Sequence, residues 1–257
     1  MIDKVIHYCW FGGSPIPEDL QRCIDSWKKF CPDYKIVRWD ESNYDVHKNQ
    51  YMSDAYKEKK WSFVSDYARL DVIYQYGGIY LDTDVELVKS LDDFLKYDMF
   101  CGFEGRDDLM DKYGITYEES VNFGLGYGAI KRHPILESML DYYEELSFYN
   151  EDGTLNFLAC PAYQTEVLRQ YGLTPNREFQ QIQGCTVFPA EVFSPKSYLT
   201  GKIVQTPNTV SIHHFKVSWT SEADQKALKE SWEFFDKYGY FWGRILLKIK
   251  RALIGKR

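Results

Sequence analysis

The stretch "SFVSDYARLDVIYQYGGIYLDTDVELV", residues 62–88, contains the pattern that decides the fold. Residues 62–76 carry apolar side chains at helical spacing, and two glycines follow directly, as they do at the C-terminal cap of a helix. A short apolar run comes next and ends on two aspartates, Asp82 and Asp84. The sequence therefore predicts a helix that leads into a buried strand with two carboxylates at its end.

The two aspartates form a candidate metal and diphosphate site. Side chains alternate along a strand, so Tyr80, Asp82 and Asp84 are expected on one face. Two nearby carboxylates repel, which raises a pKa or recruits a cation. Ligands of open α/β sheets bind at the carboxyl ends of strands, and a divalent cation suits carboxylate and phosphate oxygens. The plainer alternative, which is commoner for an isolated Asp-x-Asp, is a pair of solvated turn residues.

Strands and helices are expected on both sides of this stretch. The predicted strands are 4–12, 34–40, 99–105, 121–132 and 209–219, and further helices are predicted at 19–30 and 134–146. The opening order of strand, helix and strand indicates a parallel sheet. We expect one α/β domain over residues 1–236, most irregular between 105 and 120, and a basic amphipathic segment over residues 237–257.

The composition restricts the classes of function. The 257 residues are 44% hydrophobic, which can fill a sizeable core, and the net charge of −7 argues against broad nucleic-acid binding. The six cysteines are scattered and form no CxxC pair, so we expect a reduced, cytoplasmic compartment. No run of residues approaches the length of a transmembrane helix, so we expect any membrane contact to be peripheral.

Asp66 and Arg69 are three residues apart in the predicted helix and lie on one of its faces, near the strand end that carries the aspartates. This position favours a role in the same site. The alternative is an ordinary surface ion pair, which contributes little to stability.

Residues 65–84, "SDYARLDVIYQYGGIYLDTD", resemble the signature of glycosyltransferase family 32, the Asp-x-Asp sugar transferases that include bacterial capsule enzymes. They are more distantly similar to the catalytic domains of large glucosylating toxins. The segments "VIHYCWFG" (5–12) and "SIHHFKVSW" (211–219) resemble the family's opening strand and closing block. The resemblance implies a GT-A type, Rossmann-like α/β fold with a mostly parallel central sheet, and transfer with retention of anomeric configuration.

The resemblance also implies a role for each matching residue. Asp84 corresponds to the direct metal ligand, and Asp82 to a carboxylate that touches the ribose or reaches the metal through water. Asp66 and Arg69 correspond to contacts with donor sugar hydroxyls, and Tyr80 to a contact on the nucleotide side.

The other matching positions lie at the two ends of the resemblance. Trp10 is expected to stack on the nucleotide base, although a core tryptophan is the commoner meaning of such a residue. His214 and Ser218 are expected to complete the metal and diphosphate shell, and the Trp219 indole to donate to a diphosphate oxygen. His213 is expected to point the other way. The alternative for the histidine pair is a structural role in the core.

These features predict a metal-dependent hexosyltransferase. We expect a UDP-sugar donor, with glucose or galactose as the hexose, Mn²⁺ or Mg²⁺ as the cofactor, and a saccharide acceptor in surface polysaccharide or lipopolysaccharide synthesis. Asn122, in "VNFGLGYGAI" (121–130), is the polar residue expected to touch sugar. The alternative is a non-catalytic nucleotide-sugar or metal-binding module of the same fold.

Residues 238–257 contain no acidic residue, and as a helix they place aromatic and aliphatic side chains on one face and basic ones on the other. This pattern is typical of a helix that lies on an anionic membrane surface. It predicts a peripheral protein at the inner face of the cell membrane with a lipid-linked acceptor. The alternative is a C-terminal helix that docks on the domain.

Overall fold

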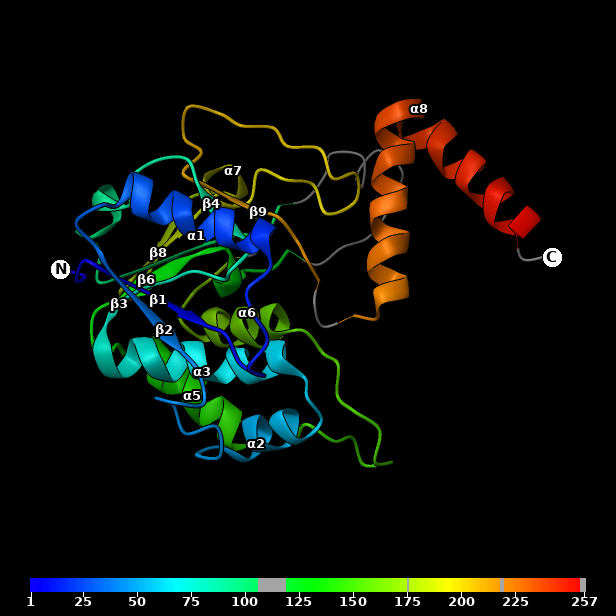
Figure 1. The fold of residues 1–257 in the computed structure, drawn as a ribbon. Coiled ribbons are helices and arrows are strands. Elements are labelled where there is room, and N and C mark those ends of the chain that lie inside the picture. The colour runs from blue at the N-terminus through cyan, green and yellow to red at the C-terminus, as the bar shows by residue number, and fades with distance from the viewer. Residues whose placement is uncertain (106–118, 175, 218–219, 255–257) are drawn as a thin grey trace.

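The computed structural model describes residues 1–105, 119–174, 176–217 and 220–254. A seven-stranded sheet forms the middle layer, in the order β2-β1-β3-β6-β5-β8-β7 (Figure 1). Its strands are β1 (Val5–Cys9), β2 (Lys35–Trp39), β3 (Gly78–Tyr80), β5 (Met99–Gly102), β6 (Tyr127–Ala129), β7 (Gln180–Ile182) and β8 (Cys185–Phe188). A separate two-stranded sheet pairs β4 (Val85–Leu87) with β9 (Ser211–His213) in antiparallel fashion.

Five of the seven strands in the main sheet run in one direction. β1 is parallel to both β2 and β3. β6 is antiparallel to both β3 and β5, so β5 regains the direction of β3, and β8 is parallel to β5. β7 is antiparallel to β8. The expected α/β class with a mostly parallel central sheet is therefore confirmed.

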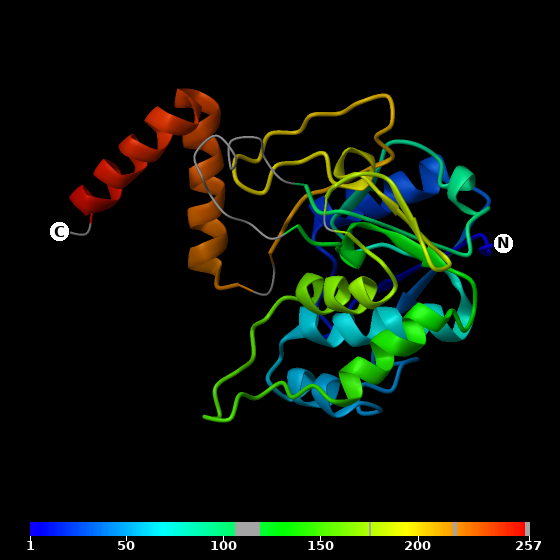
Figure 2. The ribbon, with the colours of Figure 1, turned by 180° about the vertical axis from the view of Figure 1, so that it is seen from behind.

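Helices cover both faces of the sheet (Figures 1 and 2). One face packs against α2 (Gln50–Lys57), α3 (Trp61–Tyr76), α5 (Pro134–Glu144) and α6 (Cys160–Gln170), and the other against α1 (Glu18–Phe30) and α7 (Ala190–Phe193). Short 3₁₀ turns are η1 (Asp92–Phe94) and η2 (Phe123–Leu125). Each face has its own cluster of buried apolar side chains, which makes three layers.

Helix α3 is the central helix of its layer and carries the candidate site residues Asp66 and Arg69. Ten of its sixteen residues are buried, because the sheet lies on one side of the helix and α2 and α5 lie on the other. The helix ends at Gly77, which has a φ of 67°. Gly78 also has a positive φ, 98°, and a Cβ there would lie 2.8 Å from the Val5 carbonyl oxygen. Glycine is therefore required where the chain turns from α3 into β3 beside β1.

The helices predicted at 19–30, 62–76 and 134–146 are confirmed. The strand predicted to carry the aspartates is shorter than expected: β3 ends at Tyr80, and Asp82–Asp84 form a turn closed by a hydrogen bond from Val85 N to the Asp82 carbonyl, 3.0 Å. The pairing with β6 stops there because the chain before β6 coils into η2. A common strand face is therefore the wrong explanation for the convergence of the two carboxylates.

The C-terminal helix α8 (Glu222–Ile254) consists of two arms joined at Gly239, where φ is 71° and ψ is 164° (Figure 2). The first arm docks on the domain through Trp232, whose Nε1 donates to the Tyr198 carbonyl oxygen at 2.9 Å. The second arm turns back on the first, and Lys250 pairs with Glu230 across them. None of the helices in the described ranges is long and apolar enough to cross a membrane.

Candidate active site

A cavity of about 1410 Å³ opens at the carboxyl ends of β1 and β3 and collects the polar residues singled out in the sequence. It is lined by Trp10, Asp66, Arg69, Tyr80, Asp82, Asp84 and Asn122, among others. Ser218 and Trp219 lie outside the described residues, so their predicted roles stay predictions. The cavity sits where ligands bind to open α/β sheets.

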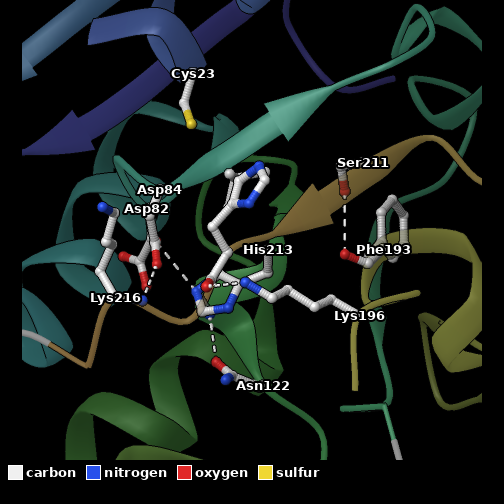
Figure 3. Close-up of polar contacts among 12 residues, drawn as sticks. Cys23, Asp82, Asp84, Asn122, Phe193, Lys196, Ser211, His213 and Lys216 are labelled. Atoms are coloured by element: carbon white, nitrogen blue, oxygen red, sulfur yellow. Dashed lines mark hydrogen bonds and ion pairs between the residues drawn. The ribbon is translucent and has the colours of Figure 1, made fainter. Parts of the chain in front are cut away.

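Asp84 and His213 form a buried ion pair in this cavity (Figure 3). His213 Nε2 lies 3.2 Å from Asp84 Oδ1, and the Lys216 backbone N–H donates to Asp84 Oδ2 at 2.9 Å. The two residues meet because β4 pairs with β9 in a register that sets Val85 opposite His213. The second small sheet therefore brings the end of the chain to the Asp-x-Asp motif.

The electrostatics of the pair favour its charged form. Burial opposes the ionisation of Asp84, but the charge and hydrogen bond of His213 outweigh it and bring the pKa of Asp84 to about 2. Burial likewise disfavours protonation of His213, and the Asp84 carboxylate still raises its pKa above the usual value. The pKa of Asp82 is raised, mainly by burial.

Asp82, Asp84 and His213 fit a divalent metal ion. Each offers a ligand atom, and these atoms lie within 4.8 Å of one another. The buried Nδ1 of His213 has no hydrogen-bond partner among the described residues. Two carboxylates and one imidazole suit Mn²⁺ and, with further oxygen ligands from a diphosphate, Mg²⁺.

The expectation that His214, rather than His213, faces the carboxylates is wrong. His214 Nε2 lies 2.9 Å from Glu86 Oε2, on the other side of the segment. Neighbouring side chains at the end of the extended β9 point in opposite directions, as expected, but the register with β4 turns His213 inward. The sequence shows the alternation and not the register.

Arg69 pairs with two carboxylates of the cavity, those of Asp82 and Asp66. Its Nη2 lies 2.8 Å from Asp66 Oδ1 and 3.3 Å from Asp82 Oδ1. The guanidinium stands over the Tyr80 ring, 5.2 Å from the centroid. Burial raises the pKa of Asp66 to about 6, although the Arg69 charge opposes the rise. The surface ion pair considered for Asp66 and Arg69 is excluded, since both residues are buried.

Tyr80 and Gly124 border the Asp82 side chain. The Tyr80 hydroxyl donates to Asp82 Oδ1 at 3.0 Å. Gly124 in η2 lies so close that a Cβ there would be 2.3 Å from Asp82 Oδ2. Asn122 caps the same turn, since its Oδ1 accepts from Gly124 N at 2.7 Å, and it also lines the cavity. Glycine is thus the residue that leaves room for the carboxylate.

Trp10 lies directly after β1 at the rim of the cavity and is half-buried. Its Nε1 donates to the Ser14 carbonyl oxygen at 2.6 Å, which fixes the ring in place. A fixed, half-exposed ring can serve as a stacking platform for a base. Its predicted contact with the nucleotide stays a prediction.

The sequence reasoning missed Glu104 and Lys216, which both line the cavity. Glu104 follows β5, and burial raises its pKa while the His213 charge opposes the rise. Its position at the end of a predicted strand was a signal that could have identified it. Lys216 had no comparable signal, because its place depends on how the chain leaves β9.

Comparison with known proteins agrees with this geometry. Residues 17–101 match the family described as "Glycosyltransferase sugar-binding region containing DXD motif". This region of the chain, which includes α3, β3 and the Asp82–Asp84 turn, is thus similar to the sugar-binding region of these glycosyltransferases, and the resemblance to Asp-x-Asp glycosyltransferases is confirmed.

The individual relatives are glycosyltransferases too. Inositol phosphoceramide mannosyltransferase 3 of Schizosaccharomyces pombe is 37% identical over 108 residues, which cover 37% of this chain and 28% of that protein. Inositol phosphoceramide mannosyltransferase 1 of the same yeast is 24% identical over 188 residues, 68% of this chain and 54% of that protein. The chain thus spans about a quarter to a half of these relatives. Among solved structures, the PaToxG glycosyltransferase is 24% identical over 66% of this chain and 69% of that one, with a TM-score of 0.47.

Proposed function

We propose that the protein is a metal-dependent glycosyltransferase of the GT-A type, which moves a hexose from a nucleotide diphosphate sugar to a hydroxyl of a saccharide. The observation that carries the proposal is the Asp82, Asp84 and His213 cluster, set beside Arg69 in the large cavity. The family match over residues 17–101 supports it, because that region is a sugar-binding region with the same motif.

We propose that different residues of the cavity bind different parts of the donor. Asp82, Asp84 and His213 would hold a divalent ion, which would supply positive charge opposite the departing diphosphate. Asp66 accepts hydrogen bonds from hydroxyl groups of the donor sugar, while Arg69 keeps the Asp82 carboxylate ionised and in place. Tyr80 orients Asp82 from below, and Trp10 stacks on the base at the rim.

We further propose that transfer retains the anomeric configuration. The bond between the anomeric carbon and the diphosphate oxygen breaks, and the acceptor oxygen bonds to the same carbon from the face that the diphosphate leaves. The acceptor proton passes to the departing diphosphate oxygen, so no protein nucleophile is required. Asn122 lies in the wall of the cavity, where its amide would contact the sugars.

The identity of the donor is the finer part of this proposal. UDP-glucose and UDP-galactose are the donors expected from the sequence. GDP-mannose is the second candidate, because the fungal relatives are named as mannosyltransferases.

The test is nucleotide release in the presence of Mn²⁺ and each of these three donors, with and without EDTA and with a set of saccharide acceptors. Wild type should release UDP or GDP only when metal is present, and Asp84→Asn should lose the release while it still folds. Asp93→Asn removes an exposed carboxylate outside the cavity and is the matched control. Binding of a donor without any release of nucleotide would contradict the proposed enzymatic activity and favour the non-catalytic binding module.

For the C-terminal segment we propose contact with an anionic membrane at the inner face of the cell membrane, where a lipid-linked saccharide of surface polysaccharide synthesis would be the acceptor. Phe241 and Trp242 on the second arm of α8 are 54% and 62% exposed, and Arg244 and Lys248 nearby are exposed as well. Exposed aromatic and basic side chains on one helix suit the boundary between headgroups and acyl chains.

Sedimentation with anionic vesicles tests this contact. Replacement of Phe241 and Trp242 by serine should abolish sedimentation with the vesicles, because it removes the side chains that insert. Phe179→Ser, which changes another exposed phenylalanine outside α8, should leave sedimentation unchanged. Equal sedimentation of the double variant and wild type would exclude this arm as the membrane contact and leave the helix docked on the domain.

A further inference from the structure

A second cavity, of about 410 Å³, lies beside the first and has a lining rich in cationic side chains. Its walls come from α1, from β4 with the end of β9, and from the first arm of α8. Lys216, Gln225 and Lys229 border both cavities, so the second adjoins the donor cavity. His214 and Glu86 line the second cavity, whereas Asp84 and His213 line the first. The two cavities thus lie on opposite sides of the β9 end.

Positive charge gathers in this second cavity, although the chain as a whole has a net charge of −7. Its lining carries four cationic side chains, Arg22, Lys196, Lys216 and Lys229, and two carboxylates, Asp19 and Glu86. Both carboxylates already have partners: Asp19 pairs with Lys216, and Glu86 with His214. Within the described ranges, no carboxylate pairs with the other three cationic side chains.

Lys196 shows that this charge is held in place. The residue is 8% exposed, whereas lysine normally keeps its ammonium group in water. Its Nζ donates to the His214 carbonyl oxygen at 2.8 Å and lies 4.1 Å from the centroid of the Trp232 ring. Figure 3 shows the side chain extended toward the end of β9. Trp232 belongs to α8, so the docked helix confines the ammonium group at the cavity.

Arg22, Lys196 and Lys229 line one cavity, and in the described ranges none of them pairs with a carboxylate. Burial lowers the pKa of Lys196, the Asp84 charge opposes this shift, and repulsion by the Lys229 charge adds to it. An anion in the cavity would relieve this repulsion, and a phosphate group accepts charge-assisted hydrogen bonds from several lysine and arginine side chains at once.

We propose that this cavity binds a phosphate group of the glycosyl acceptor. The inference rests on the proposed transfer reaction and names the chemistry of its acceptor. The donor diphosphate is assigned to the metal cluster in the first cavity, so a second cationic cavity across Lys216 serves a different anion. An acceptor phosphate there places the rest of the acceptor toward the donor cavity, where the new bond forms.

Binding of inorganic phosphate to the full chain in EDTA, followed by calorimetry, tests the cavity without the metal site. Arg22→Gln and Lys229→Gln remove exposed cationic side chains, so folding should be retained. Each should weaken phosphate binding about tenfold, the effect of losing one charge-assisted hydrogen bond. Lys29→Gln on α1 and Lys226→Gln on α8 are the matched controls, since neither residue lines the cavity and both are exposed. Equal weakening by controls and cavity variants, or no phosphate binding by wild type, would overturn the proposal.

Two further experiments distinguish a failure of this inference from a failure of the proposed transfer reaction, and they identify the source of the phosphate. Asp84→Asn should bind phosphate like wild type while losing metal-dependent nucleotide release. If wild type binds phosphate and releases no nucleotide with any acceptor, the anion cavity stands and glycosyl transfer fails. Sedimentation with phosphatidic acid vesicles that inorganic phosphate reverses, and that the Arg22→Gln Lys229→Gln variant lacks, identifies a lipid headgroup. Unaltered sedimentation of that variant identifies a soluble phosphorylated acceptor.

Discussion

Nε2 of His213 lies 3.2 Å from Oδ1 of Asp84, whereas the ring of the adjacent His214 contacts Glu86 on the other side of the segment. The two consecutive histidines therefore have different environments, one inside the candidate metal cluster and one outside it. This contrast gives the protein a built-in control for the assignment of the metal ligands.

We expect His213→Asn to weaken Mn²⁺ binding by at least about tenfold, because even partners outside the ligand shell contribute ~10–100-fold to metal affinity. His214→Asn should bind Mn²⁺ like wild type. Calorimetric titration with MnCl₂ measures both. The opposite ranking of the two variants would return the ligand role to His214.

Gly124→Ala should disturb Asp82, because the new methyl group would lie 2.3 Å from Asp82 Oδ2. The carboxylate must move, so we expect a loss of about tenfold or more in Mn²⁺ affinity. Gly128→Ala is the control: its Cβ would lie 2.6 Å from Phe100 Cε1 in the core. It should lower the melting temperature without changing the affinity of the folded protein, and an equal loss of affinity would contradict the specific contact.

Arg69→Met should destabilise the fold, because it leaves Asp66 and Asp82 without their cationic partner in a buried place. Breaking a buried charge cluster in this way costs about 3–5 kcal/mol in the free energy of unfolding. Adding Asp66→Asn should recover part of that loss, since one uncompensated charge disappears. Urea unfolding of the single and double variants measures the recovery, and its absence would show that Asp66 is neutral in the folded protein.

The stability of the fold should fall below neutral pH because of His7. Burial lowers the pKa of His7 to about 4, and its Nδ1 accepts a hydrogen bond from Trp39 Nε1 at 3.0 Å. The unfolded chain takes up a proton on this residue near pH 6.5 and the folded chain only near pH 4. Stability is thus fully present above pH 6.5 and decreases by roughly 3 kcal/mol as the pH falls to 4.

His7→Gln is the variant that checks this dependence. Glutamine does not titrate and can still accept from the Trp39 indole. Urea unfolding at pH 7 and pH 4.5 should show a smaller decrease for the variant than for wild type. Parallel decreases would assign the acid sensitivity to other groups.

Sequence patterns predicted the elements whose contacts are local. Helix α3 was predicted correctly because its apolar residues recur at helical spacing and two glycines follow directly. The family signature covers the same residues. The placement of Trp10, Asp66, Asp84 and Asn122 in one site was predicted mainly from the family resemblance, and the structure sets all four in the lining of one cavity.

Features that depend on contacts between segments far apart in the sequence could not be predicted from the sequence. The choice between His213 and His214 depends on the register of β4 with β9, which no local pattern encodes. Part of the wall of the cationic cavity comes from α8, whose Trp232 packs against the loop that carries Lys196. The turn at Asp82–Asp84 replaced the predicted strand because the chain before β6 coils into η2 instead of continuing the pairing.

The pairing of β4 with β9 has a consequence for the order in which the protein is made. The segment that matches the glycosyltransferase family ends at residue 101, and it contains both aspartates but no part of β9. A ribosome therefore completes the matching segment more than a hundred residues before it adds His213. Until β9 leaves the exit tunnel, the nascent chain carries Asp82 and Asp84 without the His213 imidazole and without the Lys216 backbone N–H that fixes Asp84.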